Sequence, residues 1–114
     1  MESQLEVSIR TEPAATVLAF SGELDLASFP VLEEAIDSIG DSAPELVVLD
    51  LGELEFMDVA GMRAVLRADE RLRERGKRLA VARPGYGTRR LLTLTGQDSV
   101  LSVFDSTAEA LASA

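Results

Sequence analysis

The stretch that decides the fold reads Val47-Val48-Leu49-Asp50-Leu51-Gly52-Glu53-Leu54-Glu55-Phe56-Met57-Asp58-Val59-Ala60-Gly61-Met62-Arg63. Its first residues continue the apolar run that starts at Leu46, and such a run is typical of a central strand covered on both faces. We interpret the acidic segment that follows as a turn. Asp58 is a suitable N-cap, because its carboxylate can accept from the free amides at a helix start. The stretch therefore predicts a buried strand, an acidic turn and a helix.

Two strands and a helix are predicted before this stretch. Apolar and polar residues alternate from Leu5 to Ile9 with the period of two that indicates a half-buried strand. Residues 16–20 indicate a second strand, and the turn at 11–13 predicts that the two strands form a hairpin. Ser28 is expected to cap a helix with apolar residues at helical spacing, which ends at Gly40.

The remaining elements alternate between helix and strand. The helix after Asp58 carries an apolar stripe, and residues 79–82 form the next predicted strand. A loop over residues 84–87 precedes a short helix from Thr88 to Thr95. Residues 101–104 indicate a last strand, and Thr107 is expected to cap a C-terminal helix.

The order of predicted elements is therefore ββαβαβαβα. Strands separated by helices favour parallel pairing through right-handed crossovers, whereas the opening hairpin is antiparallel. We expect an α/β fold with a mixed, mostly parallel sheet of four to five strands and about four helices. With 114 residues and no linker or repeat, the chain is expected to be one domain over residues 1–114.

Composition excludes several classes of chemistry. The chain has neither cysteine nor histidine, which excludes disulfides, thiolate nucleophiles, cysteine-ligated zinc and histidine acid–base catalysis. A net charge of −9, with 20 acidic and 11 basic residues, disfavours binding to nucleic acid or to anionic membranes. It suits a basic protein partner, although solubility alone also explains it. Neither a signal peptide nor a membrane span is evident, so we expect a cytoplasmic protein.

A metal site is one interpretation of the acidic segment. Asp50, Glu53, Glu55 and Asp58 could supply the oxygen ligands that Mg²⁺ prefers. However, we placed Asp50 at a strand end and the other three along a turn, and charge runs of this kind are usually solvated faces. We therefore predict no metal and no cofactor.

Four stretches together resemble the signature of the STAS family, which includes the anti-sigma-factor antagonists of bacteria. They occur in the family's order and spacing, and the resemblance spans nearly the whole chain. The stretches are Gly22-Glu23-Leu24-Asp25, then Leu49-Asp50-Leu51 through Phe56-Met57-Asp58, then Gly61 with its helix, and Arg89-Arg90-Leu91-Leu92-Thr93-Leu94-Thr95-Gly96.

The resemblance implies a STAS fold and a regulatory function without catalysis. Such antagonists bind an anti-sigma factor, often a serine kinase, and so release a sigma factor. The kinase then phosphorylates a serine at the start of the helix, and the complex dissociates. A phosphate adds about −1.5 to −2 charges at the centre of the contact, which explains the release.

This chain differs from the family at the switch position. Val59 follows the aspartate where the serine is usual, and Ala60 comes next. Neither side chain has a hydroxyl group, so neither can be phosphorylated. The module is then either always competent to bind, or it is a scaffold or a small-ligand or nucleotide sensor with other partners. A third interpretation is that another hydroxyl, such as that of Ser21 or Thr95, is modified.

The resemblance places the partner-binding surface at the start of the helix and at a neighbouring loop. Each of these residues also has a purely structural explanation: a cap, a solvated turn, inward packing, or close approach of two backbone segments. The expected site residues are Glu23, Asp25, Asp58, Val59, Ala60 and Gly61. The oligomeric state is left open. We interpret Tyr86 as part of a turn, although it could also anchor an interface. Arg89 and Arg90 could meet a carboxylate or a phosphate, but we interpret them as a solvated helix face.

Overall fold

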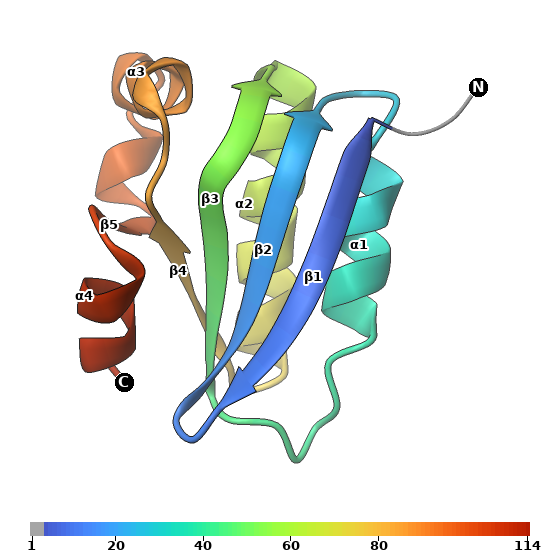
Figure 1. The fold of residues 1–114 in the computed structure, drawn as a ribbon, viewed down its shortest axis with the longest axis vertical. Coiled ribbons are helices and arrows are strands. Elements are labelled where there is room, and N and C mark those ends of the chain that lie inside the picture. The colour runs from blue at the N-terminus through green and yellow to red at the C-terminus, as the bar shows by residue number, and fades with distance from the viewer. Residues whose placement is uncertain (1–3) are drawn as a thin grey trace.

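The computed structural model describes residues 4–114. Within these residues a five-stranded sheet has the order β1-β2-β3-β4-β5, and only β1 and β2 pair antiparallel, because a two-residue turn joins them (Figure 1). The α/β class and the mixed, mostly parallel sheet are therefore confirmed. The strands are β1 (Leu5–Glu12), β2 (Ala15–Leu24), β3 (Leu46–Met57), β4 (Arg78–Ala82) and β5 (Ser102–Phe104).

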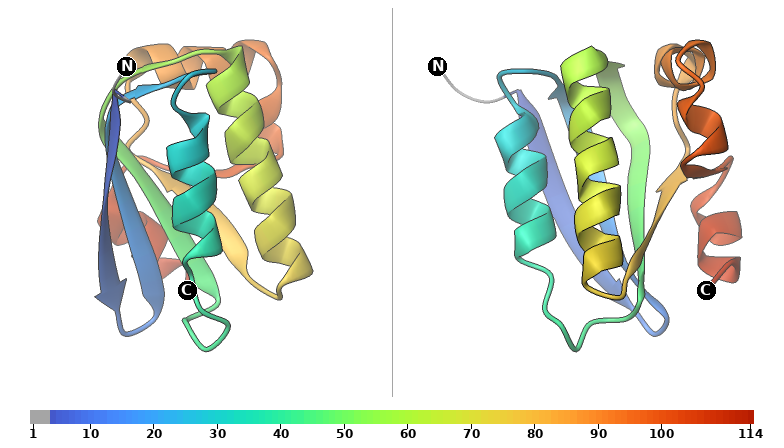
Figure 2. Two further views of the ribbon diagram at one scale, coloured as in Figure 1. Left: turned by 90° about the vertical axis from the view of Figure 1, so that its right-hand side faces the viewer. Right: turned by 180° about the vertical axis from the view of Figure 1, so that it is seen from behind.

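Four α-helices and a short 3₁₀ helix accompany the sheet in the described part of the chain. They are α1 (Phe29–Asp37), α2 (Val59–Glu74), α3 (Tyr86–Leu94), η1 (Gln97–Ser99) and α4 (Thr107–Ala112). Helices α1 and α2 lie side by side behind the sheet, whereas α4 lies on its front side (Figures 1 and 2). The predicted order of strands and α-helices is confirmed.

The core has two parts, one on each side of the sheet. The larger part lies between the sheet and α1 and α2, and includes Leu18, Phe20, Leu49 and Leu72. The smaller part includes Val48 and lies between the sheet and Ala110 of α4. Because both faces of β3 are covered at its beginning, the apolar run from Leu46 to Leu49 is explained.

The acidic segment after Leu49 is not a turn, and that prediction was wrong. β3 continues to Met57, because β2 runs beside it and pairs Ser21 with Glu53 and Leu24 with Met57. The pairing shifts register between Ala19 and Ser21 and again between Gly22 and Glu23. These irregularities break the alternation of buried and exposed residues, and the pattern therefore looked like a turn.

Two predicted helix starts differ from the structure, and a third is at the predicted residue but lacks the expected capping bond. Ser28 occupies the N-cap position of α1 but makes no capping hydrogen bond. Helix α3 starts at Tyr86, so the second half of the predicted loop at 84–87 is helical. The cap of α4 is Ser106, whose Oγ accepts from the amide of Glu109, and Thr107 is the first helical residue.

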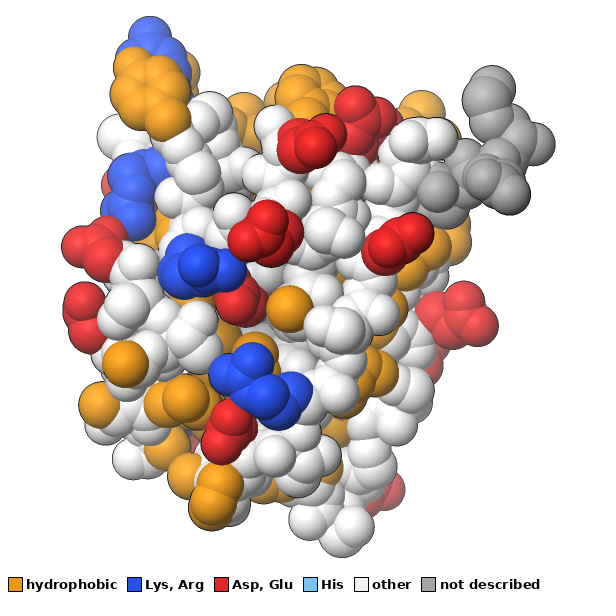
Figure 3. All heavy atoms as spheres, viewed as in Figure 1, with side chains coloured by type: hydrophobic (Ala, Val, Ile, Leu, Met, Phe, Trp, Pro, Cys, Tyr) orange, Lys and Arg blue, Asp and Glu red, His pale blue; other side chains and the backbone are white. Residues whose placement is uncertain are grey.

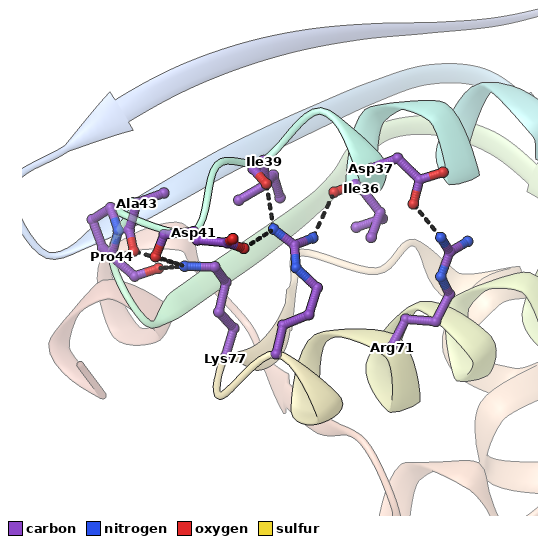
Figure 4. Close-up of polar contacts among 9 residues, drawn as sticks. Ile36, Asp37, Ile39, Asp41, Ala43, Pro44, Arg71 and Lys77 are labelled. Carbon is purple, nitrogen blue, oxygen red and sulfur yellow. Dashed lines mark hydrogen bonds and ion pairs between the residues drawn. The ribbon is translucent and has the colours of Figure 1, made fainter.

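The C-terminal end of α2 is attached to the segment between α1 and β3 by basic side chains (Figure 4). Arg71 pairs with Asp37, and Arg75 donates to the carbonyls of Ile36 and Ile39. The buried Lys77 follows the helix, and its Nζ donates to the carbonyl oxygens of Ala43 at 2.7 Å, Asp41 at 3.4 Å and Pro44 at 3.5 Å.

Candidate protein-binding site

The start of α2 is fixed to the end of β2 by Asp58. Its backbone is extended, and its Oδ1 accepts from the amide of Gly61 at 2.8 Å, as expected of an N-cap. Its own amide donates to the carbonyl of Leu24 at 3.3 Å. The predicted cap is confirmed, and the first turn of α2 has a defined position relative to β2.

Gly61 allows α2 to approach β2 closely. A Cβ atom at this position would lie 2.2 Å from the carbonyl oxygen of Leu24 and 2.8 Å from its carbonyl carbon. Any larger residue would therefore push the helix away from the strand. The sequence left two roles open for Gly61: contact with a partner, or close approach to a neighbouring strand. The structure supports the second role.

The loop between β2 and α1 is held by its own side chains. Asp25 Oδ1 accepts from the amides of Ala27 at 3.1 Å and Ser28 at 3.0 Å. The hydroxyl of Ser28 donates to the carbonyl of Glu23 at 2.7 Å and accepts from the amide of Asp25 at 3.0 Å. Ser28 therefore closes this loop instead of capping α1. Asp25 shapes the backbone, while Glu23, still within β2, is half-buried.

Exposed apolar side chains surround the start of α2. Val59 is 44% exposed, Leu26 in the neighbouring loop is 71% exposed, and Phe56 near the end of β3 is 50% exposed. Ala60 is partly exposed. We call Leu26, Phe56, Val59 and Ala60 the α2-start surface. The space-filling view shows apolar and acidic side chains together along this upper edge (Figure 3). Single exposed apolar residues are ordinary, but a group around one helix start is typical of a contact surface.

Sequence reasoning missed Leu26 and Phe56. Leu26 directly follows Asp25 in the loop before the first predicted helix, where an apolar residue has no internal role, and that was the available signal. Phe56 lay in a segment interpreted as a turn, so its place on β3 near the start of α2 could not be inferred. The sequence had placed Val59 and Ala60 either in a contact patch or in the core, and the structure places both at the surface.

The hydroxyl groups considered for modification differ in their surroundings. Thr95 follows α3, and its Oγ1 lies 2.7 Å from the carbonyl oxygen of Leu91 and 3.2 Å from Sδ of the buried Met62 in α2. Thr95 therefore connects α3 to the first turn of α2. Ser21 lies within β2 beside Glu53 of β3, away from the start of α2.

Two of the four acidic residues considered as a magnesium site have other partners. Asp50 lies within β3, not at its end as expected, and its Oδ1 accepts from Arg83 Nε at 2.9 Å and from the Gly52 amide at 3.0 Å. The hydrogen bond to Asp50 raises the pKa of Arg83. Asp58 caps α2. Within residues 4–114, no three acidic side chains are grouped in a way that could hold a metal ion.

The other surface residues singled out in the sequence lie on α3. Tyr86 is 82% exposed at the first position of that helix. Arg89 pairs with Asp105 at 2.7 Å in an exposed position, and Arg90 is exposed. Across the described residues, no helix has both the length and the apolar character needed to cross a membrane.

Comparison with known proteins places these observations in a family. The family model described as "Mlab, STAS domain" matches residues 7–102, and the chain belongs to the STAS domain family. The chain is 32% identical over 107 residues to the anti-sigma-F factor antagonist RsfB of Mycobacterium tuberculosis, an alignment that covers 94% of this chain and 87% of RsfB. It is 26% identical over 108 residues to an anti-sigma F factor antagonist of Paenibacillus polymyxa, with 94% and 92% of the two chains covered.

Solved structures give the same grouping. The crystal structure of an anti-sigma factor antagonist from Mycobacterium paratuberculosis superposes with a TM-score of 0.85 at 28% identity, covering 96% of this chain and 92% of that one. The unphosphorylated form of the antagonist SpoIIAA superposes with a TM-score of 0.74 at 19% identity, over 93% of each chain. That second likeness concerns the fold alone.

Proposed function

We propose that this protein is an anti-sigma factor antagonist that binds an anti-sigma factor through the α2-start surface. The observation that carries the proposal is the exposure of Val59, an apolar residue, at a helix start whose position is fixed by Asp58 and Gly61. The similarity to anti-sigma-F factor antagonists supports the class of partner. Binding would sequester the anti-sigma factor and release the sigma factor for transcription.

Each predicted site residue has a separate part in this contact. Val59 and Ala60 make the apolar centre, and Leu26 and Phe56 extend it. Asp58 and Gly61 act by fixing the first turn of α2, since one is the cap and the other is buried against Leu24. Asp25 fixes the loop that presents Leu26, and the Glu23 carboxylate offers a charge to basic groups of the partner. Buried apolar side chains at the centre of an interface usually contribute most of the affinity.

We further propose that the partner is of the serine-kinase type, that both proteins are cytoplasmic, and that the antagonist is not itself an enzyme. Phosphorylation at the start of α2 would not release the complex, because Val59 and Ala60 have no hydroxyl group. Control would then depend on the amount of antagonist or on the partner. A kinase whose target has lost its hydroxyl would remain bound as long as the antagonist is present.

The direct test is calorimetric titration of the purified protein with the anti-sigma factor encoded in the same genome. Tight binding is expected for the natural chain. Val59→Glu should weaken it by about 2 kcal/mol or more, roughly thirtyfold, because the carboxylate would be desolvated at the centre of the contact. Ala108→Glu adds the same charge on exposed α4, at the opposite end of the molecule, and should leave the affinity unchanged. Equal affinities for all three proteins would refute this contact surface.

A second test concerns the kinase. Val59→Ser places a hydroxyl group directly after the N-cap of α2, and incubation with the same anti-sigma factor and ATP should then yield a phosphorylated protein. The natural chain should remain unmodified in the same reaction, as judged by intact mass. Failure to modify the serine variant, despite normal binding, would contradict a serine-kinase partner while leaving the contact surface intact.

A further inference from the structure

β1 is an edge strand of the sheet. In the order β1-β2-β3-β4-β5, no strand among residues 4–114 lies beyond it (Figure 1). It is eight residues long, from Leu5 to Glu12. In an antiparallel pair, alternate residues direct their backbone N–H and C=O groups away from the partner strand. From Glu6 to Glu12, β1 therefore offers a row of backbone groups to which another strand can pair.

Two of the three charged residues of β1 are arranged symmetrically about Ser8. Edge strands are often protected from pairing by charged side chains. Here Glu6 and Arg10 carry opposite charges, each lies two residues from Ser8, and all three side chains share one face of the strand. In an antiparallel pair of two identical strands centred on Ser8, Glu6 of each copy faces Arg10 of the other. The charges of this edge therefore favour pairing with itself.

We propose that β1 is a self-association edge, through which two copies of this chain pair antiparallel about Ser8 and form one continuous sheet. The other face of the strand supports this register. Val7 packs against the core, whereas Ile9 is 52% exposed. In the proposed pair, Val7 of one copy faces Ile9 of the other, so the exposed isoleucine becomes covered. Apolar and opposite-charge pairs directly across a sheet both stabilise it.

Three other registers bring like charges together. Pairing centred on Glu6 or on Arg10 sets that residue against its own copy, and pairing centred on Ile9 sets Glu6 against Glu12. Within one copy, Arg10 Nε lies 2.7 Å from Glu12 in an exposed ion pair. Exposed pairs of this kind contribute little, so Arg10 can turn to Glu6 of the second copy.

The test uses charge reversal and sedimentation equilibrium of the purified protein without any partner. The natural chain should show a concentration-dependent dimer. Glu6→Arg alone and Arg10→Glu alone each set like charges across the pair, and each should weaken dimerisation about tenfold or more. An equimolar mixture of the two variants restores both opposite-charge pairs and should dimerise. A monomeric natural chain at the highest soluble concentration, or a mixture no more dimeric than the separate variants, would overturn the proposal.

Cross-linking tests the register itself. The chain has no cysteine, so one introduced thiol reports one position. Residues directly opposite in an antiparallel pair have Cα atoms about 4.5–5.5 Å apart, within the roughly 4.4–6.8 Å that a disulfide spans. Ser8→Cys should therefore form a disulfide-linked dimer under mild oxidation. Thr11→Cys, an exposed control on the same strand that would face Leu5, should form far less. Equal cross-linking of the two variants would contradict pairing about Ser8.

Discussion

The two ends of α2 are built in different ways. At its C-terminal end, Arg71, Arg75 and Lys77 bind carbonyls and carboxylates 33 to 39 residues back along the chain, at the end of α1 and in the segment before β3. At its N-terminal end, the contacts are a cap and a backbone approach to Leu24, and the side chains pointing outward are apolar. The basic side chains at the C-terminal end bind other parts of the same molecule, whereas the apolar side chains at the N-terminal end stay exposed to solvent.

Under the proposed function, residues that stabilise the fold lie at one end of α2 and residues that contact the partner lie at the other. Polar contacts at the C-terminal end are satisfied inside the fold, so they offer little to a partner. Exposed apolar groups at the N-terminal end add nothing to the core, and their burial by a partner would be favourable. Substitutions at the C-terminal end should therefore change the free energy of unfolding, whereas substitutions at the N-terminal end should change the affinity for the partner.

The largest effect on stability is expected at Lys77. Lys77→Met keeps the aliphatic part of the side chain but removes the ammonium group from three carbonyl oxygens. Urea unfolding should show a loss of about 2–3 kcal/mol, with unchanged affinity for the anti-sigma factor. Arg90→Met, on the exposed face of α3, should change stability by less than about 0.5 kcal/mol. A weaker affinity of the Lys77→Met variant for the anti-sigma factor would contradict the separation of stability and binding between the two ends.

A smaller loss is expected for Gly61→Ala. The added methyl group would collide with the Leu24 backbone, and we expect a cost of about 2 kcal/mol in the free energy of unfolding. Gly87→Ala is the matched control, because nothing lies within 4 Å of its added Cβ in α3. It should stabilise the helix by up to about 1 kcal/mol. Similar losses for the two variants would mean that the close approach at Gly61 is unimportant.

Loss of the α2 cap should cost less again. Asp58→Ala removes the acceptor of the Gly61 amide and should lower stability by about 1 kcal/mol. Asp58→Asn retains a capping oxygen and should cost only a fraction of that amount. If both variants bind the anti-sigma factor normally, Asp58 serves the helix alone; if Asp58→Asn binds poorly while remaining stable, its charge contacts the partner.

The smallest effect concerns Asp69, midway along α2. Burial raises the pKa of this carboxyl group, although Arg73 at 3.2 Å acts in the opposite direction. Because the folded pKa lies above the unfolded one, the ionised group destabilises the protein at neutral pH, and this cost disappears as the pH falls through the folded pKa. Asp69→Asn should therefore give a small gain in stability at pH 7 that vanishes in acid. A gain that persists in acid would contradict this account.

The sequence was sufficient for the order of elements because each strand or helix has a strong local pattern. The apolar run from Leu46 to Leu49 is typical of a covered strand, and Asp58 before an apolar stripe is a suitable helix N-cap. The course of β3 beyond Leu49 depends instead on pairing with an irregular β2, which no local pattern reveals. The same limit applies to the proposed site: the motif points to Val59 and Ala60, while Leu26 and Phe56 come near them only through the fold.

The exposure of Tyr86 determines what optical measurements can report. It is the only tyrosine in a chain without tryptophan, so the intrinsic fluorescence of the protein comes essentially from one residue that already faces water. Unfolding should change this signal little, which makes circular dichroism the better probe of stability. If the partner lacks both tryptophan and tyrosine, a change in the emission on binding indicates contact near α3, so this one fluorophore reports whether the interface extends beyond the start of α2.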